Sequence, residues 1–134
     1  MVLLKNIALT IIAILLFFPL TFINLILVLF VGRKTFYKTI CGYFFSAALN
    51  IDKFACREFR TLWNLILINK SFYHSFGNND ETISYCLGIN KKLNALSKTG
   101  IFLCAVLNWL DKDHVEKAVI IHNNNVKNNE VINF

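Results

Sequence analysis

The first feature of the chain is a long N-terminal segment, residues 6–32, that carries no charged side chain. As a helix this segment would extend about 40 Å, whereas the hydrocarbon core of a bilayer is about 30 Å thick. The pattern predicts one transmembrane helix, with residues 1–33 as the membrane anchor. Pro19 removes a backbone donor inside this helix, so we expect a kink there. A re-entrant hairpin turning at Pro19 is the alternative, although it would expose unpaired backbone groups to lipid.

Basic residues follow the anchor directly. Arg33, Lys34 and Lys38 come after it, compared with Lys5 before it. This excess of positive charge favours a cytoplasmic location for the rest of the chain. The same three side chains are expected to lie at the membrane surface, where they can bind anionic headgroups. A cleaved signal peptide is not expected, because the apolar run is too long and lacks a small-x-small cleavage site.

The patterns after the anchor are shorter and are typical of a small helical domain over residues 34–121. A second uncharged run, residues 39–51, is too short to cross a bilayer as a helix. Apolar residues then recur at helical spacing, which predicts a membrane-proximal amphipathic helix over about 47–68. The fold class is therefore mainly α, with one N-terminal transmembrane helix followed by a small helical domain.

A polar segment that follows Gly77 predicts the start of a further helix. Asn78 and Glu81 have the spacing of a capping box, in which each residue satisfies a backbone donor of the first turn. The helix is expected to end near Leu87, with Gly88 as its left-handed cap.

The last third of the chain contains one apolar segment and one more predicted helix start. Residues 101–110 are apolar nearly all round, so we expect them to form the central core element of the domain. Asp113 and Glu116 repeat the capping-box spacing and predict a last helix that ends near residue 121. Residues 122–134 have no sustained apolar period and are expected to form a frayed tail.

Composition supports a membrane protein and argues against several other classes. The chain is 56% hydrophobic, and its formal charge of +6 comes without a dense Lys/Arg run, so nucleic-acid binding is not expected. The four cysteines form no C-x-x-C pair and are interpreted as buried free thiols. We expect no cofactor and no bound metal.

Two polar clusters are the candidate site. Each lies at a predicted helix start: Asp80, Glu81, Thr82 and Ser84 at the first, and Asp111, Asp113, His114 and Glu116 at the second. If the fold brings them together, the carboxylates and the imidazole could bind a divalent metal or form an acid/base pair, and the catalytic candidates are then Asp80, Glu81 and His114.

Simpler interpretations of the same residues carry more weight. Helix N-termini attract acidic and hydroxyl side chains to satisfy orphan donors, without any function. A third interpretation lies between a functional site and simple capping: Asp80 or Glu81 hydrogen-bonds His114 in a structural network. The chain has no nucleophile elbow, P-loop, dinucleotide fingerprint or H-E-x-x-H pair. His74 and His122 are interpreted as incidental.

Three short strings resemble a known pattern: I-D-K-F from Ile51, G-N-N-D-E-T-I-S from Gly77, and D-K-D-H from Asp111. The segment is similar to a family of short uncharacterised proteins encoded by bacteriophages and prophages, whose pattern is I-D-x-[FL], G-x-P-D-E-T-[IL]-S and D-x-x-H. Asn79 stands where the family more often has proline. The resemblance implies a viral or prophage gene in a bacterium, and it favours one site containing Asp80, Glu81, Thr82, Ser84 and His114.

Three functions are consistent with these observations. The leading hypothesis is a non-enzymatic interaction module tethered to the bacterial inner membrane, with an unknown protein partner. The second is a holin-like or otherwise membrane-disrupting lysis accessory, because phage lysis proteins are commonly small, basic and membrane-spanning. The third is a metal-dependent enzyme that uses Asp80 and Glu81 together with Asp111 and His114.

Overall fold

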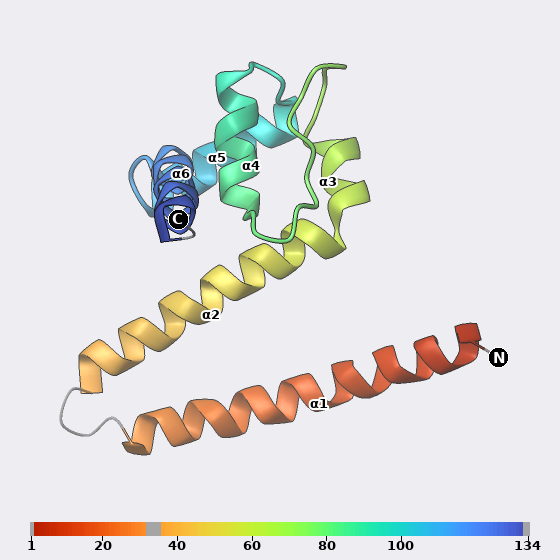
Figure 1. The fold of residues 1–134 in the computed structure, drawn as a ribbon, viewed down its shortest axis with the longest axis vertical. Helices are drawn as coiled ribbons and strands as arrows, with labels where there is room; N and C mark the ends of the chain where they lie inside the picture. Colours follow the sequence, from red (N-terminus) through yellow and green to blue (C-terminus); the bar gives the residue numbers. More distant parts are fainter. Residues whose placement is uncertain (1, 32–35, 133–134) are drawn as a thin grey trace. The chain divides into compact units, whose positions relative to one another are not determined.

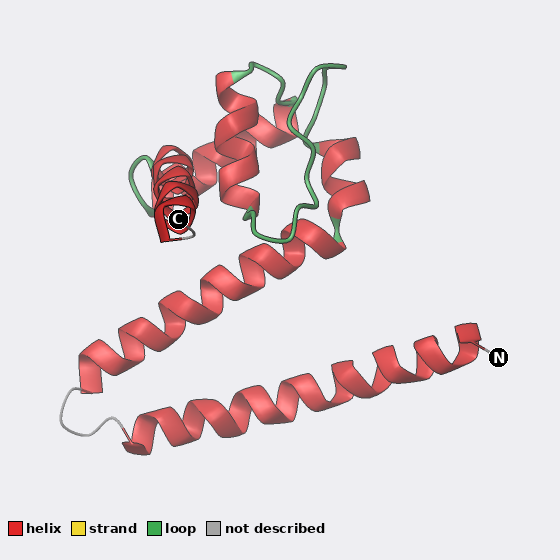
Figure 2. Cartoon of the chain, viewed as in Figure 1, coloured by secondary structure: helices red, strands yellow, loops and turns green. Residues whose placement is uncertain are grey.

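The computed structural model describes residues 2–31 and 36–132 of the chain. Over these residues the secondary structure is helical, with one isolated antiparallel bridge between Ile68 and Leu96 (Figures 1 and 2). The helices are α1 (Val2–Val31), α2 (Phe36–Glu58), α3 (Arg60–Ile66), α4 (Ile83–Lys92), α5 (Lys98–Leu110) and α6 (His114–Ile132). The predicted fold class is confirmed: the chain is mainly α, with a long apolar N-terminal helix followed by a small helical domain.

Helix α1 is long and apolar enough, from Val2 to Phe30, to cross a membrane. No residue in its most apolar window is buried within the chain. Pro19 lies inside α1, which continues on both sides of it. The hairpin alternative is therefore wrong. A continuous helix leaves few backbone groups unpaired at a proline, whereas a turn in lipid would leave many.

Helix α2 differs from the amphipathic helix predicted over 47–68. It starts at Phe36, includes the uncharged run, and ends at Glu58. Phe59 leaves the helical conformation, with φ −100° and ψ 20°, and α3 follows it. The predicted single helix is therefore two helices.

The chain divides into two compact units, residues 1–47 and 48–134. This division falls within α2, so the first part of that helix belongs to the N-terminal unit and the rest to the second unit. Arg33 and Lys34, which were predicted to lie at the membrane surface, fall outside the described residues, whereas Lys38 is an exposed residue of α2.

The second unit is organised around α4. This helix packs most extensively against α6 and also against α5, and α5 contacts α6. A Cβ atom added at Gly88 would lie 2.4 Å from the Val115 carbonyl oxygen and 2.6 Å from Val119 Cγ2. Gly88 is therefore not the predicted helix cap. It lies within α4, where the absence of a side chain lets α6 approach the backbone closely.

The hydrophobic core is small and surrounds α4. Its largest fully buried apolar side chains are Leu67, Leu87, Val115 and Val119. The prediction that residues 101–110 form the central core element is wrong. Helix α5 buries only Gly100 and Cys104, while Phe102 and Trp109 are 68% and 83% exposed.

Helix α6 begins and ends differently from the prediction. Asp113 has a positive φ of 59°, which is the left-handed region rather than the extended conformation of an N-cap. The helix continues to Ile132, so the predicted frayed tail from residue 122 is helical as far as that residue. The packing against α4 fixes the first turns of α6. Each further residue then gains one backbone hydrogen bond, so the helix can continue through a polar sequence.

Candidate functional site

Two asparagines, the half-buried Asn64 and the fully buried Asn90, hold the long loop between α3 and α4. Asn64 accepts a hydrogen bond from the Phe76 amide (2.9 Å) and donates to the Phe76 carbonyl oxygen (3.3 Å). Asn90, which is fully buried, does the same for His74, at 2.8 and 2.7 Å, and also donates to the Cys86 carbonyl oxygen. These paired bonds satisfy backbone groups that have no secondary-structure partner, and they place the His74 side chain next to α4.

Two side chains satisfy the free amides at the start of α4. The Thr82 hydroxyl accepts from the Tyr85 amide at 3.0 Å, and Asp52 Oδ1 accepts from the Ile83 amide at 3.0 Å. The N-cap is therefore Thr82 rather than the predicted Asn78. Asn78 instead donates to Glu81 Oε1 at 3.0 Å. The carboxylate of Asp52 thus joins the C-terminal part of α2 to the positive end of α4.

A chain of four polar side chains, here called the hydroxyl–imidazole cluster, connects α2, α4 and α6. It consists of Asp52, Ser84, His114 and Asp111. Ser84 Oγ donates to Asp52 Oδ2 at 3.0 Å and lies 3.2 Å from His114 Nε2. The other ring nitrogen, Nδ1, lies 3.1 Å from Asp111 Oδ2. Ser84 is only 5% exposed, whereas Asp111 is exposed at the end of α5 and also pairs with Lys117.

Asp111 contacts His114, and His114 contacts Ser84, as the three residues of a catalytic triad do. The direction of the hydrogen bonds, however, differs from that of a triad. A serine hydroxyl has one proton, and Ser84 donates it to Asp52. Ser84 Oγ then has no proton left for His114 and can only accept from Nε2. A general base would instead have to accept the serine proton. The arrangement therefore lacks the general base of a catalytic triad, and its hydrogen bonds join three helices.

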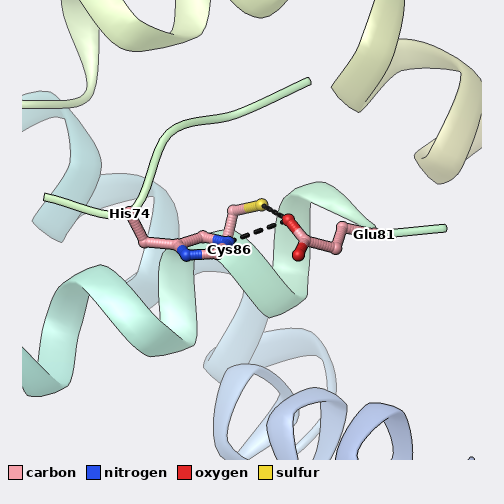
Figure 3. A group of neighbouring side chains, drawn as sticks. All are labelled: His74, Glu81 and Cys86. Carbon is pink, nitrogen blue, oxygen red and sulfur yellow. Dashed lines mark hydrogen bonds and ion pairs between the residues drawn. The ribbon is translucent and has the colours of Figure 1, made fainter. Parts of the chain in front are cut away.

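A second group, here called the thiol cluster, lies at the other side of the first turn of α4. It consists of Cys56, His74, Glu81 and Cys86. His74 Nε2 lies 2.8 Å from Glu81 Oε2, and Cys86 Sγ donates to the same oxygen at 3.3 Å. The Cys86 and Cys56 sulfurs are 3.7 Å apart. Figure 3 shows the imidazole and the thiol of Cys86 both directed at the Glu81 carboxylate.

The thiol cluster is chemically distinct from its surroundings because its groups are buried together. Both cysteines are fully buried, and Glu81 is 5% exposed. The hydrogen bond between the two thiols lowers the pKa of Cys56 and raises that of Cys86, and burial raises the Cys86 pKa further. The ligand atoms of His74, Glu81 and Cys86 lie within 4.8 Å of one another, so these three side chains could hold one metal ion.

The structure brings together only part of the predicted candidate site. Ser84, Asp111 and His114 meet, but Glu81 pairs with His74 instead of His114. The remaining predicted residues have other roles: Thr82 caps α4, Glu116 pairs with Lys91, and Asp80 and Asp113 are exposed in turns.

Four residues of the two clusters were missed as site residues. Asp52 was visible only as part of the I-D-K-F string, and His74 looked incidental because no other ligand type lies beside it in the sequence. The interpretation of Cys56 and Cys86 as buried free thiols is confirmed, as it is for Cys104, whereas Cys41 is exposed. Cys86 lies 12 positions after His74, and the two side chains share the Glu81 carboxylate only because the loop folds back on α4.

One small cavity of about 180 Å³ lies between α4 and α5, lined by Lys91, Leu96, Ile101, Cys104, Ala105 and Asn108. None of these residues belongs to either cluster, so the cavity gives a substrate no access to Ser84 or Glu81. Comparisons of the chain with protein-family models, with curated proteins and with solved structures found no match.

Proposed function

We propose that the protein is a non-enzymatic interaction module, tethered to the inner membrane of a bacterium by α1 and encoded by a phage or prophage. The observation that carries the proposal is the apolar surface of α1. Its residues from Val2 to Phe30 form one uninterrupted helix, and the chain itself covers none of the most apolar window. In water this surface would be strongly unfavourable, while a bilayer would cover it entirely.

The charge around α1 supports a cytoplasmic position for the second unit. Three basic residues, Arg33, Lys34 and Lys38, follow the helix within a few positions, whereas Lys5 precedes most of it. Basic residues next to a membrane span are retained preferentially on the cytoplasmic side. The same side chains would bind anionic headgroups and hold the start of α2 at the membrane surface.

The surface of α5 supports an interaction role. Phe102, Ala105 and Trp109 recur at helical spacing on the exposed side of this helix. Leu110 at its end is also 69% exposed. Contiguous exposed apolar side chains of this kind are typical of surfaces that bind another protein. The partner would contact α5 while α1 confines the unit to the membrane.

A test in bacteria separates this proposal from membrane disruption. The full chain, with a protease site and an epitope added after Phe134, is induced and then challenged with protease in spheroplasts. We expect the epitope to be lost only after lysis, while growth and the membrane potential are unchanged. Collapse of the membrane potential on induction would favour the holin-like function. Loss of the epitope in intact spheroplasts would place the second unit outside the cytoplasm.

A serine hydrolase is the second candidate, because Asp111, His114 and Ser84 have the contacts of a catalytic triad. A fluorophosphonate probe reacts with an activated serine hydroxyl and tests this directly. We expect no labelling of the full chain, since Ser84 is buried and donates its proton to Asp52. Labelling that Ser84→Ala abolishes would show that the serine is a nucleophile and would contradict the non-enzymatic proposal.

A further inference from the structure

Four side chains that commonly bind transition metals converge inside the second unit. We propose that the thiol cluster is a structural Zn²⁺ site, in which His74, Glu81, Cys86 and Cys56 are the four ligands. Thiolate and imidazole ligands together favour zinc over the hard cations Mg²⁺ and Ca²⁺, and four protein ligands are typical of a structural rather than a catalytic zinc site.

The distances from the Cys86 sulfur to the Cys56 sulfur and to the Glu81 carboxylate are close to those of tetrahedral coordination. On one zinc ion, two thiolate sulfurs lie about 3.8 Å apart, and a sulfur and a carboxylate oxygen lie about 3.6 Å apart. The two sulfurs here are 3.7 Å apart, and Cys86 Sγ is 3.3 Å from Glu81 Oε2. Cys86 therefore needs little movement to bind the ion. Cys56 lies outside the set of mutually close ligand atoms formed by His74, Glu81 and Cys86, so its sulfur has to move toward them to become the fourth ligand.

The imidazole needs one small movement. A nitrogen and an oxygen on one zinc ion lie about 3.4 Å apart, whereas His74 Nε2 and Glu81 Oε2 are 2.8 Å apart. The His74 side chain is 32% exposed, so it can rotate outward by this amount without displacing the core. The same partial exposure gives the ion a path from solvent to otherwise buried ligands.

Outer contacts orient the ligands, as they do at known zinc sites. Asn78 occupies Glu81 Oε1, which leaves Oε2 directed at the cluster. Asn90 holds the backbone of His74 and also bonds the Cys86 carbonyl oxygen, so one buried amide positions two of the ligands.

A metal would also supply stability that the core lacks. Among the residues that the structure describes, the largest fully buried side chains are four apolar ones and those of Asn90, Cys56 and Cys86. Small units with so little apolar burial commonly depend on disulfides or on a structural metal. Zinc would replace the hydrogen bonds within the cluster with stronger bonds that join α2, the loop and α4.

The test uses the full chain purified in mild detergent, without reductant or chelator. We expect one zinc ion per chain by elemental analysis, and a thiolate-to-cobalt charge-transfer band after replacement with Co²⁺. Cys86→Ser and His74→Gln should lower the metal content at least tenfold. Cys56→Ser should reduce the charge-transfer intensity by about half, since one of two thiolates is lost. Cys104→Ser removes a buried thiol outside the cluster and should leave the metal content unchanged.

A measurement on the unmodified chain avoids the risk that a variant fails to fold. Addition of a chelator should increase the alkylation rate of Cys56 and Cys86 at least tenfold and leave that of Cys104 unchanged. The proposal is overturned if neither stoichiometric zinc nor a cobalt band is found, if the chelator changes no alkylation rate, or if Cys56 and Cys86 form a disulfide. An unchanged cobalt band in Cys56→Ser would contradict the four-ligand set. None of these results depends on α1 or on membrane insertion.

Discussion

At the scale of single residues, Asn90 is a buried polar group whose every bond has a structural role. Its amide makes three hydrogen bonds, two to the backbone of His74 and one to the Cys86 carbonyl oxygen. An alanine at this position would leave backbone groups of the loop without partners in a site that water reaches poorly. The Asn90 side chain therefore contributes more to the stability of the fold than a polar residue in a sequence would suggest.

We predict that Asn90→Ala lowers the free energy of unfolding of the second unit by about 3 kcal/mol, since several partly buried groups lose their hydrogen bonds. The measurement is urea unfolding of the full chain in mild detergent, monitored by tryptophan fluorescence, because Trp63 packs against the core. Asn124→Ala changes an exposed asparagine of α6 and is the control. Equal stability of the two variants would show that the loop is not held through Asn90.

The ion pair between Lys91 and Glu116 predicts a pH effect. The hydrogen bond from Lys91 holds the pKa of Glu116 below its usual value of 4.5. A carboxylate whose pKa is lower in the folded state stabilises that state above 4.5, and the contribution disappears as the pH falls through the folded pKa. Glu116→Gln should therefore be less stable than the parent chain at pH 6, and the difference should narrow below pH 4.5.

Urea unfolding at a series of pH values measures this difference. Glu58→Gln, which removes a carboxylate paired only with the neighbouring Arg57, is the matched control. A gap between Glu116→Gln and the parent chain that stays constant down to pH 3 would contradict the assigned role of the ion pair.

The candidate site shows what the sequence could and could not predict at this scale. Ser84, Asp111 and His114 could be selected because they stand at helix starts with suitable chemistry. Their partner Asp52 and the pairing of Glu81 with His74 could not, because both depend on how α2 and the loop fold against α4. Local spacing predicts contacts within a helix, not between elements far apart in the chain.

At the scale of elements, α4 and α5 exchange the roles expected from their sequences. Helix α4 contains serine, asparagine and two lysines, yet it buries five residues, because Ser84 and Asn90 find hydrogen-bond partners inside the unit. Helix α5 is more apolar and buries only two. An apolar side chain is buried only if it lies on the face of the helix that packs against the rest of the unit. In α5, Phe102 and Trp109 lie on the exposed face.

Helices α4 and α6 cross closely at Gly88, so a side chain at this position should be destabilising. Gly88→Ala should destabilise the second unit by about 2 kcal/mol, because the new Cβ would overlap the Val115 carbonyl oxygen and push α6 away. Gly42→Ala is the control: nothing lies within 4 Å of its added Cβ, so it should be neutral or stabilise α2 by up to about 1 kcal/mol. Urea unfolding measures the first variant, and thermal loss of helical circular dichroism compares both.

Equal effects of the two glycine substitutions would mean that α6 is not packed against α4 at Gly88. The prediction also bears on the hydroxyl–imidazole cluster, because displacing α6 would move His114 away from Ser84. The imidazole resonances of His114 in NMR spectra should therefore shift in Gly88→Ala and stay unchanged in Gly42→Ala.

At the scale of the whole molecule, the class of fold could be predicted because it depends on one strong signal. The charge-free N-terminal segment is sufficient to predict a long apolar helix, and the helical spacing after it is sufficient to predict a small helical unit. The boundaries were less predictable. Residues 39–51 form the middle of one long helix, and no proline, glycine or side-chain cap marks the break at Phe59 in the sequence.

The central claim is that α1 spans a bilayer and anchors the rest of the chain. Alkaline carbonate extraction of membranes from bacteria producing the full chain tests it most directly, because this treatment releases peripheral proteins and retains integral ones. We predict that the protein stays in the membrane pellet, and that replacing Ile12 and Leu16 with arginine releases it, since charges inside the bilayer are costly. Release of the unmodified chain into the alkaline supernatant would contradict the claim.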